Sequence, residues 1–410
     1  MAARDNAVKL LGWGAITAAW IAVFCLLGAT GLEFFLKFKW EAEEAKPYSN
    51  KPRFKQLVEA YRPFSVQHIN PHYLFFFPFD RAKRAAVNNA VVTVNADGFR
   101  GPGPEKAGNR EIAFLLGGSA AFGFYASSDE TTITGYLNRI QERYFFVNTG
   151  VASWNSTQEL YRLANQIAEY KPALLIAYDG ANDIAIMLTY AKNGVFYPPG
   201  TPESFDRLSA LVENIRAESR QSTGSYIETL FPRLFMRARV AIDSYRMVGK
   251  STHITEQMIE ATVKKYTLNL SLMDSLSRAI GARFIGILQP MIRLHKNRPR
   301  ELREEMEDGV YRRFHSMLLR GSPLKFEFHD FSSLFDTFDE NELYFDRNGS
   351  ADITDKTIFV DKVHLGDHGN ELVARAILSR LCKTGHADQS GCDVPRQETY
   401  RRLSAQIETP

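Results

Sequence analysis

Residues 170–183 read YKPALLIAYDGAND, and this stretch carries the clearest signal of the fold. Pro172 ends the preceding helix, because proline has no N–H for the helical hydrogen-bond ladder. The apolar run 173–179 that follows is short and unbroken, which is typical of a strand covered on both faces. Gly180 and the polar residues after it end the run and predict a loop.

The same pattern recurs on both sides of this stretch. Further apolar runs predict strands at 111–116, 145–148, 283–288 and 325–328. Helical spacing predicts helices at 133–140, at 156–167 with a Ser156–Glu159 capping box, at about 254–280, from Pro299 to just before Gly321, and over 372–381. Strands that alternate with helices imply βαβ units. We therefore expect an α/β fold, a flavodoxin-like three-layer α/β/α sandwich with a mainly parallel five-stranded sheet.

The composition excludes several classes of protein. The chain has 410 residues, of which 45% are apolar and 24% charged, so it is not disordered, collagenous or a coiled coil. A net charge of +3 with both signs mixed gives no nucleic-acid footprint. Three cysteines are too few for a disulfide framework or a cysteine-rich zinc module.

Residues 10–32 predict an uncleaved membrane anchor. These 23 residues carry no charge, and as a helix they would span roughly 34 Å, enough for a bilayer core of ~30 Å. A cleaved signal peptide and a buried core helix are the alternatives. The short head, residues 1–9, favours a cytoplasmic N-terminus, which places the rest of the chain outside the cytoplasm as a single-pass inner-membrane (periplasmic) protein.

The remaining chain divides into three parts. Residues 33–108 are interpreted as a stalk and N-terminal extension, residues 109–385 as the main domain with a helical insertion at about 190–253, and residues 386–410 as a C-terminal tail. Cys382 and Cys392 would close a small disulfide loop in an oxidising compartment, or remain two free thiols.

Polar and glycine residues follow the predicted strands, where ligands bind in an open parallel sheet. Ser119 follows the first strand and Gly150 the second. Asn182 follows the third, and Asp361 and His364 lie near the chain end. Each of these pieces is common in loops, so only their combination at matching strand ends is informative.

The combination resembles the SGNH hydrolase family, or GDSL-like esterases, of the membrane-anchored bacterial type. The four residues that name the family fall on Ser119, Gly150, Asn182 and His364, and the similarity runs from about 95 to 382. Similar phrases are GFRG (98–101), ILQP (287–290) and DKVHLGDHGNELVA (361–374). Two departures are Gly118, where the motif has Asp, and Ala120, where it has Leu; the glycine is a common variant in the family.

The resemblance implies a role for each residue. Ser119 is the expected nucleophile and His364 its base, with Asp361 orienting the imidazole. The expected oxyanion hole consists of the backbone N–H groups of Ser119 and Gly150 and the side-chain amide of Asn182. The absence of a Cβ at Gly150 is expected to let the backbone approach the substrate.

The expected function is a membrane-anchored serine esterase that hydrolyses O-acetyl esters on exported or cell-surface carbohydrate. The alternatives are an O-acyltransferase to polysaccharide served by a membrane acyl donor, a lysophospholipase or thioesterase, and an inactive binding scaffold. The expected partners are the acylated substrate and the bilayer, through residues 10–32. No cofactor, metal or nucleic acid is expected. His368, four residues after His364, is interpreted as a helix start and not as a metal ligand.

Overall fold

The computed structural model describes residues 30, 32, 50–61, 88–192, 254–299, 306–321, 323–346, 351–387 and 392. Nearly all of them belong to one compact unit, residues 50–207 together with 252–410. The predicted head and anchor lie outside the described residues apart from two positions, as do most of the predicted insertion and of the tail. Within the described ranges no helix has the length and apolar character needed to span a membrane.

Five parallel strands form the sheet, in the order β2-β1-β3-β4-β5. The strands are β1 (Glu111–Gly117), β2 (Tyr144–Asn148), β3 (Leu174–Asp179), β4 (Arg283–Leu288) and β5 (Glu327–Asp330). The α/β class and the five-stranded parallel sheet are confirmed, and the order is the flavodoxin-like one. Only the last strand is displaced from its predicted position, because Glu327–Asp330 begins two residues later. The strand order reverses direction between β1 and β3, where such folds bind their ligands.

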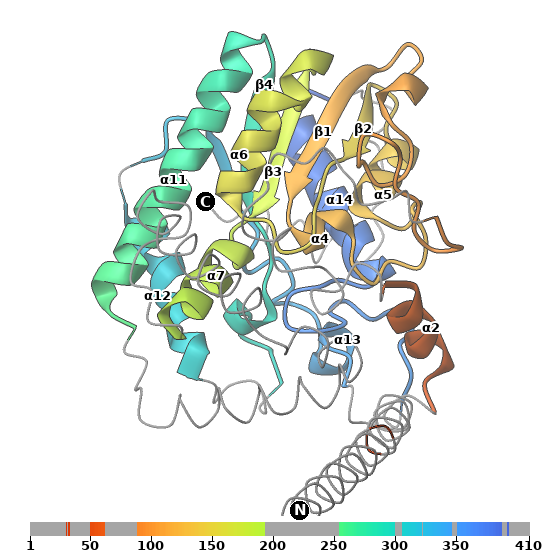
Figure 1. Cartoon of the computed structure of the whole chain (residues 1–410), viewed down its shortest axis with the longest axis vertical. Coiled ribbons are helices and arrows are strands. Elements are labelled where there is room, and N and C mark those ends of the chain that lie inside the picture. The colour runs from red at the N-terminus through yellow and green to blue at the C-terminus, as the bar shows by residue number, and fades with distance from the viewer. Residues whose placement is uncertain are drawn as a thin grey trace, which may run out of the picture. The chain divides into compact units, whose positions relative to one another are not determined.

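Side chains alternate across the sheet and build two cores. Ala113 and Leu115 of β1 face one core, whereas Phe114 and Leu116 face the other. Helices α5 (Ile133–Ile140) and α14 (Asp367–Lys383) cover the first face. The second face is covered by α6 (Ser156–Asn165), α7 (Ala181–Lys192), α11 (Glu256–Ala279) and α12 (Met306–Arg320). Helices on both faces explain why β1 to β4 are buried along most of their length, whereas the edge strand β5 is only partly buried (Figure 1).

The start of α6 differs from the sequence prediction by one residue. Asn155 is the N-cap: its side chain accepts from the backbone of Thr157 and Gln158, and the Gln158 side chain completes the capping box. The predicted Ser156–Glu159 capping box is therefore wrong. Asparagine and serine are equally good N-caps, so composition alone could not choose between Asn155 and Ser156.

Helix α2 (Pro52–Tyr61) lies in the segment predicted to be stalk and extension, and it belongs to the same compact unit as the sheet. The Tyr61 hydroxyl donates to the carbonyls of Gly123 (2.9 Å) and Ala126 (2.7 Å). The Phe54 ring lies 4.8 Å from that of Phe345, centroid to centroid. This helix therefore holds the loop that follows β1.

The remaining short elements connect the larger ones. They are η3 (Pro104–Lys106), α4 (Ser119–Phe122), η4 (Ile167–Tyr170), η5 (Ile292–Leu294) and α13 (Glu340–Leu343). A disulfide joins Cys382, in the last turn of α14, to Cys392. The bonded form is thus the one that the structure shows, and not the pair of free thiols.

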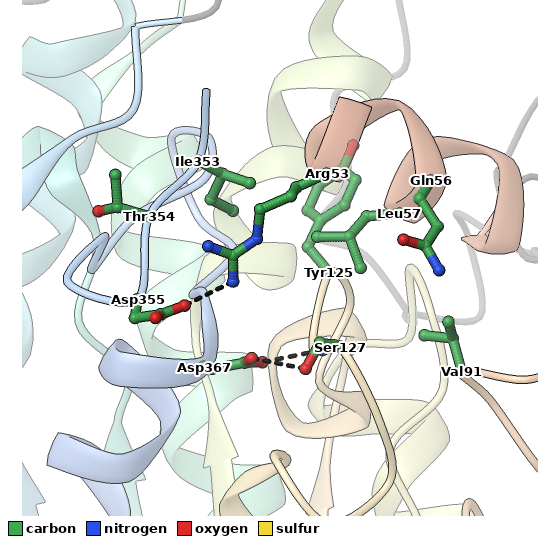
Figure 2. Close-up of a pocket in the computed structure, with 10 residues that line it drawn as sticks. All are labelled: Arg53, Gln56, Leu57, Val91, Tyr125, Ser127, Ile353, Thr354, Asp355 and Asp367. Atoms are coloured by element: carbon green, nitrogen blue, oxygen red, sulfur yellow. Dashed lines mark hydrogen bonds and ion pairs between the residues drawn. The ribbon is translucent and has the colours of Figure 1, made fainter. Parts of the chain in front are cut away.

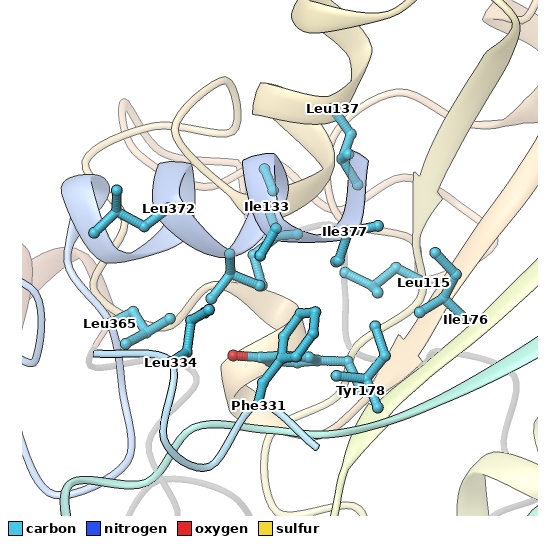
Figure 3. Packing of buried hydrophobic residues seen from close by; sticks show 14 of the residues in the cluster. Leu115, Ile133, Leu137, Ile176, Tyr178, Phe331, Leu334, Leu365, Leu372 and Ile377 are labelled. Carbon is cyan, nitrogen blue, oxygen red and sulfur yellow. The ribbon is translucent and has the colours of Figure 1, made fainter. Parts of the chain in front are cut away.

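Leu115 tests the core between the sheet and α14. Its side chain is fully buried, and it lies beside Ile176 of β3 in the cluster of Figure 3. We expect Leu115→Ala to lower the free energy of unfolding by about 2–5 kcal/mol, because the substitution leaves a cavity that the packed layers cannot close. Urea unfolding followed by circular dichroism measures this change.

Leu268→Ala is the matched control, because Leu268 of α11 is 51% exposed. We expect that change to cost about 0.5 kcal/mol or less. Equal losses from the two substitutions would contradict the assignment of Leu115 to a packed core.

Candidate functional site

Three of the residues predicted from the sequence meet at the carboxyl edge of the sheet. The Oγ of Ser119 lies 2.7 Å from Nε2 of His364. The other ring nitrogen, Nδ1, lies 2.7 Å from Oδ2 of Asp361. Ser119 opens α4 directly after β1, while Asp361 and His364 lie just before α14. The imidazole therefore bridges a hydroxyl and a carboxylate through its two different nitrogens.

A tight turn fixes the carboxylate of this trio. Oδ1 of Asp361 accepts the backbone N–H groups of Val363 (2.9 Å) and His364 (2.8 Å). The second oxygen is left to accept from the imidazole. Asp and His three residues apart thus contact each other within one turn, which is why the Asp-x-x-His spacing was informative.

Two aromatic rings enclose the imidazole. The ring of Phe124 lies 5.1 Å from that of His364, and the ring of Tyr125 lies 5.7 Å away, edge to face. Tyr125 has a φ of +74°, a left-handed conformation that costs a non-glycine residue about 1–3 kcal/mol. Sequence reasoning missed both rings, because nothing in their local pattern connects them to a histidine about 240 positions later.

Arg100 and Tyr61 hold the loop that carries these rings. The buried guanidinium of Arg100 donates to the carbonyls of Phe122 (2.8 Å) and Gly123 (2.7 Å) and pairs with Asp129. Tyr61 donates to the same Gly123 carbonyl. Burial raises the pKa of the Tyr61 phenol above its ordinary value, so that it remains a donor. The strained backbone at Tyr125 is thus fixed from outside the loop.

The structure gives Gly150 a different reason to be glycine from the one predicted. A Cβ at this position would lie 2.2 Å from the backbone nitrogen of Phe122 in α4. Glycine is therefore required for close packing against the helix that begins with Ser119. The N–H of Gly150 donates to Oδ1 of Asn148, 3.0 Å away.

Asn182 lies beside the residue that precedes the serine. Its Nδ2 donates to the carbonyl of Trp154 at 2.7 Å. A Cβ added to Gly118 would lie 2.2 Å from this same nitrogen. An amide carries two N–H groups, so one remains for another acceptor. The crowding gives a physical reason for glycine, and not the motif's aspartate, at position 118.

A surface pocket of about 90 Å³ adjoins the enclosing rings. Tyr125 lines it (Figure 2). The same ring also contacts that of His364. Across the pocket, Arg53 of α2 pairs with Asp355, and Ser127 donates through its hydroxyl to Asp367 at 2.6 Å. Helix α2 thus supplies one wall of a pocket that shares the Tyr125 ring with the surroundings of the imidazole.

A second Ser–His–Asp contact has a different geometry. Ser332 Oγ and Asp330 Oδ2 both approach the same nitrogen of His315, Nε2, at 3.0 and 2.7 Å. Because both groups contact the same nitrogen, the imidazole of His315 cannot accept the hydroxyl proton at one nitrogen while the carboxylate orients the other. This cluster therefore lacks the two-sided arrangement seen at His364.

Within the residues that the structure describes, no group of three or more His, Cys, Asp or Glu side chains is placed to bind a metal ion. His368 lies in the first turn of α14, as the turn-and-helix interpretation expected, and burial lowers its pKa.

Comparisons with known proteins give likenesses to solved structures only. No family model matches the chain, and no curated protein matches it. A GDSL-like lipase from Bacteroides thetaiotaomicron is 12% identical, with a TM-score of 0.32, over 69% of this chain and 92% of its own. An acetylxylan esterase from Geobacillus stearothermophilus is 13% identical, with a TM-score of 0.34, over 66% and 94%.

The acetyl xylan esterase AlAXEase is 11% identical, with a TM-score of 0.37, over 66% of this chain and 99% of its own. At such values these likenesses do not decide a reaction. The function proposed below stands on the geometry of the site.

The geometry predicts that Ser119 is more nucleophilic than an ordinary serine. Diisopropyl fluorophosphate is expected to add once per chain, at Ser119, because His364 accepts the hydroxyl proton as the oxygen attacks. Peptide mass spectrometry locates the adduct. His364→Ala is expected to slow labelling by at least about 100-fold.

Ser332 provides an internal control, since its hydroxyl also contacts a histidine and a carboxylate but lacks the two-sided geometry. Labelling at Ser332, or labelling of Ser119 that does not depend on His364, would contradict this account of the site.

Proposed function

We propose that the protein is a serine ester hydrolase that uses Ser119, His364 and Asp361 as a catalytic triad. The observation that carries the proposal is the hydrogen-bonded chain from Ser119 Oγ through both nitrogens of His364 to Asp361. Its position at the carboxyl ends of the strands, by the β1/β3 switch point, is where this fold class binds ligands.

The reaction follows from these contacts. Ser119 Oγ attacks the ester carbonyl carbon while its proton passes to Nε2 of His364. Asp361 stabilises the resulting imidazolium through Nδ1–H. The imidazolium then protonates the departing alcohol, which leaves an acyl group on Ser119. Water attacks this acyl-enzyme with His364 again as base, and releases the acid and the free serine.

The oxyanion of each tetrahedral intermediate needs donors near Ser119. We assign them to the backbone N–H groups of Ser119 and Gly150 and to the side-chain amide of Asn182. The amide is the best supported of the three, because it lies against Gly118 and has a second N–H to give. The N–H of Gly150 would have to share or exchange its bond to Asn148.

The proposed substrate is an acetyl ester on exported or cell-surface carbohydrate. The pocket beside Tyr125 supports a polyhydroxylated ligand, because amide, hydroxyl and carboxylate groups line it together with an aromatic ring. The proposed location is outside the cytoplasm, with residues 10–32 as the membrane anchor. The uncharged run 10–32 and the Cys382–Cys392 disulfide support this location, since disulfides persist in oxidising compartments.

The first experiment compares the full-length protein with Ser119→Ala on p-nitrophenyl acetate, butyrate and octanoate. We expect acetate to be cleaved fastest and the variant to lose at least about 10³-fold in kcat, because no nucleophile remains. Release of p-nitrophenol is followed by absorbance.

Equal rates in the two proteins would overturn the assignment of the triad. A preference for octanoate would favour a lipolytic enzyme. Transfer of acetyl to an added sugar in preference to water would favour an acyltransferase.

Gly118→Ala tests the placement of Asn182. We expect kcat to fall by about 10–100-fold with KM nearly constant, because the new methyl displaces the amide that binds the oxyanion. Gly309→Ala on α12 is the control, since its Cβ would meet nothing closer than 3.5 Å. If the two variants retain equal activity, the amide of Asn182 does not contribute to the reaction.

A further inference from the structure

Three carboxyl groups lie buried together behind Asn182. They belong to Glu159 of α6, Asp179 at the end of β3 and Asp183 of α7, and each side chain is at most 3% exposed. No ion pair joins any of them to a cation within the described part of the chain. Three uncompensated charges at such depth would be very costly. We call these three residues the carboxyl cluster.

The hydrogen bonds within the carboxyl cluster are unevenly distributed. Asp183 accepts from the Ser156 hydroxyl (2.7 Å) and from its backbone N–H (3.3 Å). Asp179 accepts through Oδ1 from the Tyr266 hydroxyl at 2.6 Å. Among the described residues, no hydrogen-bond donor reaches either carboxyl oxygen of Glu159 or the Oδ2 atom of Asp179.

A proton on Glu159 resolves this imbalance. The carboxyl groups of Glu159 and Asp179 interact directly, so a proton on Glu159 would supply the donor that both groups lack. Burial, reinforced by the charge of Asp179, raises the pKa of Glu159 well above its ordinary value. Burial also raises the pKa of Asp179 to about 6 and, with the charge of Asp179, that of Asp183 to about 7.

The titratable groups that face the cluster are few. Glu159 comes from α6, Asp179 from β3, Asp183 from α7 and Tyr266 from α11. Burial and the neighbouring acids raise the pKa of Tyr266, so it remains a neutral donor. Every charge that the cluster gains on losing protons is therefore negative.

Two neighbouring hydrogen bonds between the segment 154–156 and the start of α7 connect the cluster to the proposed oxyanion site. Asn182 donates to the carbonyl of Trp154. Two residues after Trp154, Ser156 donates to Asp183, the residue that follows Asn182. Asn269 of α11 donates to the Ser156 hydroxyl at 2.8 Å and fixes its direction. The segment 154–156 and the start of α7 are thus joined directly behind the amide.

We propose that Glu159, Asp179 and Asp183 are positioning residues for Asn182, and that they hold its amide in place only while the cluster retains protons. The proposal rests on the proposed function. Loss of protons sets like charges in contact at low dielectric. The repulsion separates α6 from the β3–α7 junction, which weakens both bonds and misplaces the amide. Catalysis then fails on the alkaline side although the triad is intact.

The same protons affect the stability of the fold. The native state holds protons that the unfolded chain releases near pH 4, so the free energy of unfolding contributed by these groups decreases as pH rises. Asp179 and Asp183 set the window of this loss from about pH 4 to about pH 7. Because the pKa of Glu159 is also raised, it adds to the loss in the same direction.

The test measures kcat and KM of the full-length protein for p-nitrophenyl acetate from pH 5.5 to 9.5, with the rate of Ser119→Ala subtracted. We expect the wild-type kcat to fall by about 10–100-fold above pH 7 while KM changes less than twofold, as for loss of an oxyanion donor. The side-chain amide of Glu159→Gln can donate to Asp179 at every pH. In this variant we expect kcat to begin to fall at a pH at least one unit higher than in the wild type.

Glu142→Gln is the matched control, because Glu142 is exposed and is not a member of the carboxyl cluster. It is expected to follow the wild type. Asn182→Ala is expected to show a lower kcat without the alkaline fall, because no amide remains to be misplaced. An alkaline fall that persists in both Glu159→Gln and Asn182→Ala would overturn the proposal.

Thermal unfolding between pH 5 and pH 8.5 gives a readout that does not need activity. The wild-type Tm is expected to decrease over this range more steeply than that of Glu159→Gln, or of Asp183→Asn should the first variant not fold. If the Tm of the wild type and of the variant decreases equally with pH, the claim that the carboxyl cluster holds protons in the native state is contradicted. If the wild type hydrolyses no ester at any pH, the proposed function and the positioning role both fail, whereas the unfolding curves still decide whether the carboxyls hold protons.

Discussion

The site depends on backbone hydrogen bonds that continue the pairing of β1 beyond the end of β2. Thr149 donates to the carbonyl of Leu115 and Val151 to that of Gly117, each at 3.0 Å. These bonds draw Gly150 against the helix that begins with Ser119. They form only because position 150 has no side chain, since a Cβ there would meet the backbone nitrogen of Phe122. The hydrogen-bond register at this point of the sheet therefore requires glycine at position 150.

The packing of α14 brings the histidine to the serine. His364 lies immediately before this helix, and Leu372 and Ile377 of the helix pack in the same core as Leu115 of β1 (Figure 3). Hydrophobic burial thus closes a sequence separation of 245 residues between Ser119 and His364. Local bonds in the turn at Asp361 then join the carboxylate to the imidazole.

Local signals in the sequence were sufficient for much of this arrangement. Apolar runs located the sheet, and the residues after the first strand made Ser119 a candidate. Asp361 and His364, near the chain end, were singled out by the resemblance that the combined motifs carry, because each motif alone is common in loops. The start of α6 was misplaced by one residue, because Asn and Ser are equally good N-caps. Only the structure shows that Asn155 is the N-cap.

Long-range contacts could not be predicted in the same way. Glu159 looked like a helix-capping residue, and its burial against Asp179 depends on how α6 packs on the sheet. Phe124 and Tyr125 become part of the site only through their contact with His364. No periodicity or spacing in one sequence encodes such partners.

The two donors that converge on the carbonyl of Gly123 have an evolutionary consequence. Tyr61 comes from α2 and Arg100 from the segment before β1, yet both fix the same loop. A recombination event that exchanged the chain at the start of the first strand would separate that loop from both of its supports. The segment from α2 to β1 is therefore expected to be inherited together with the residues that follow β1, as a single module.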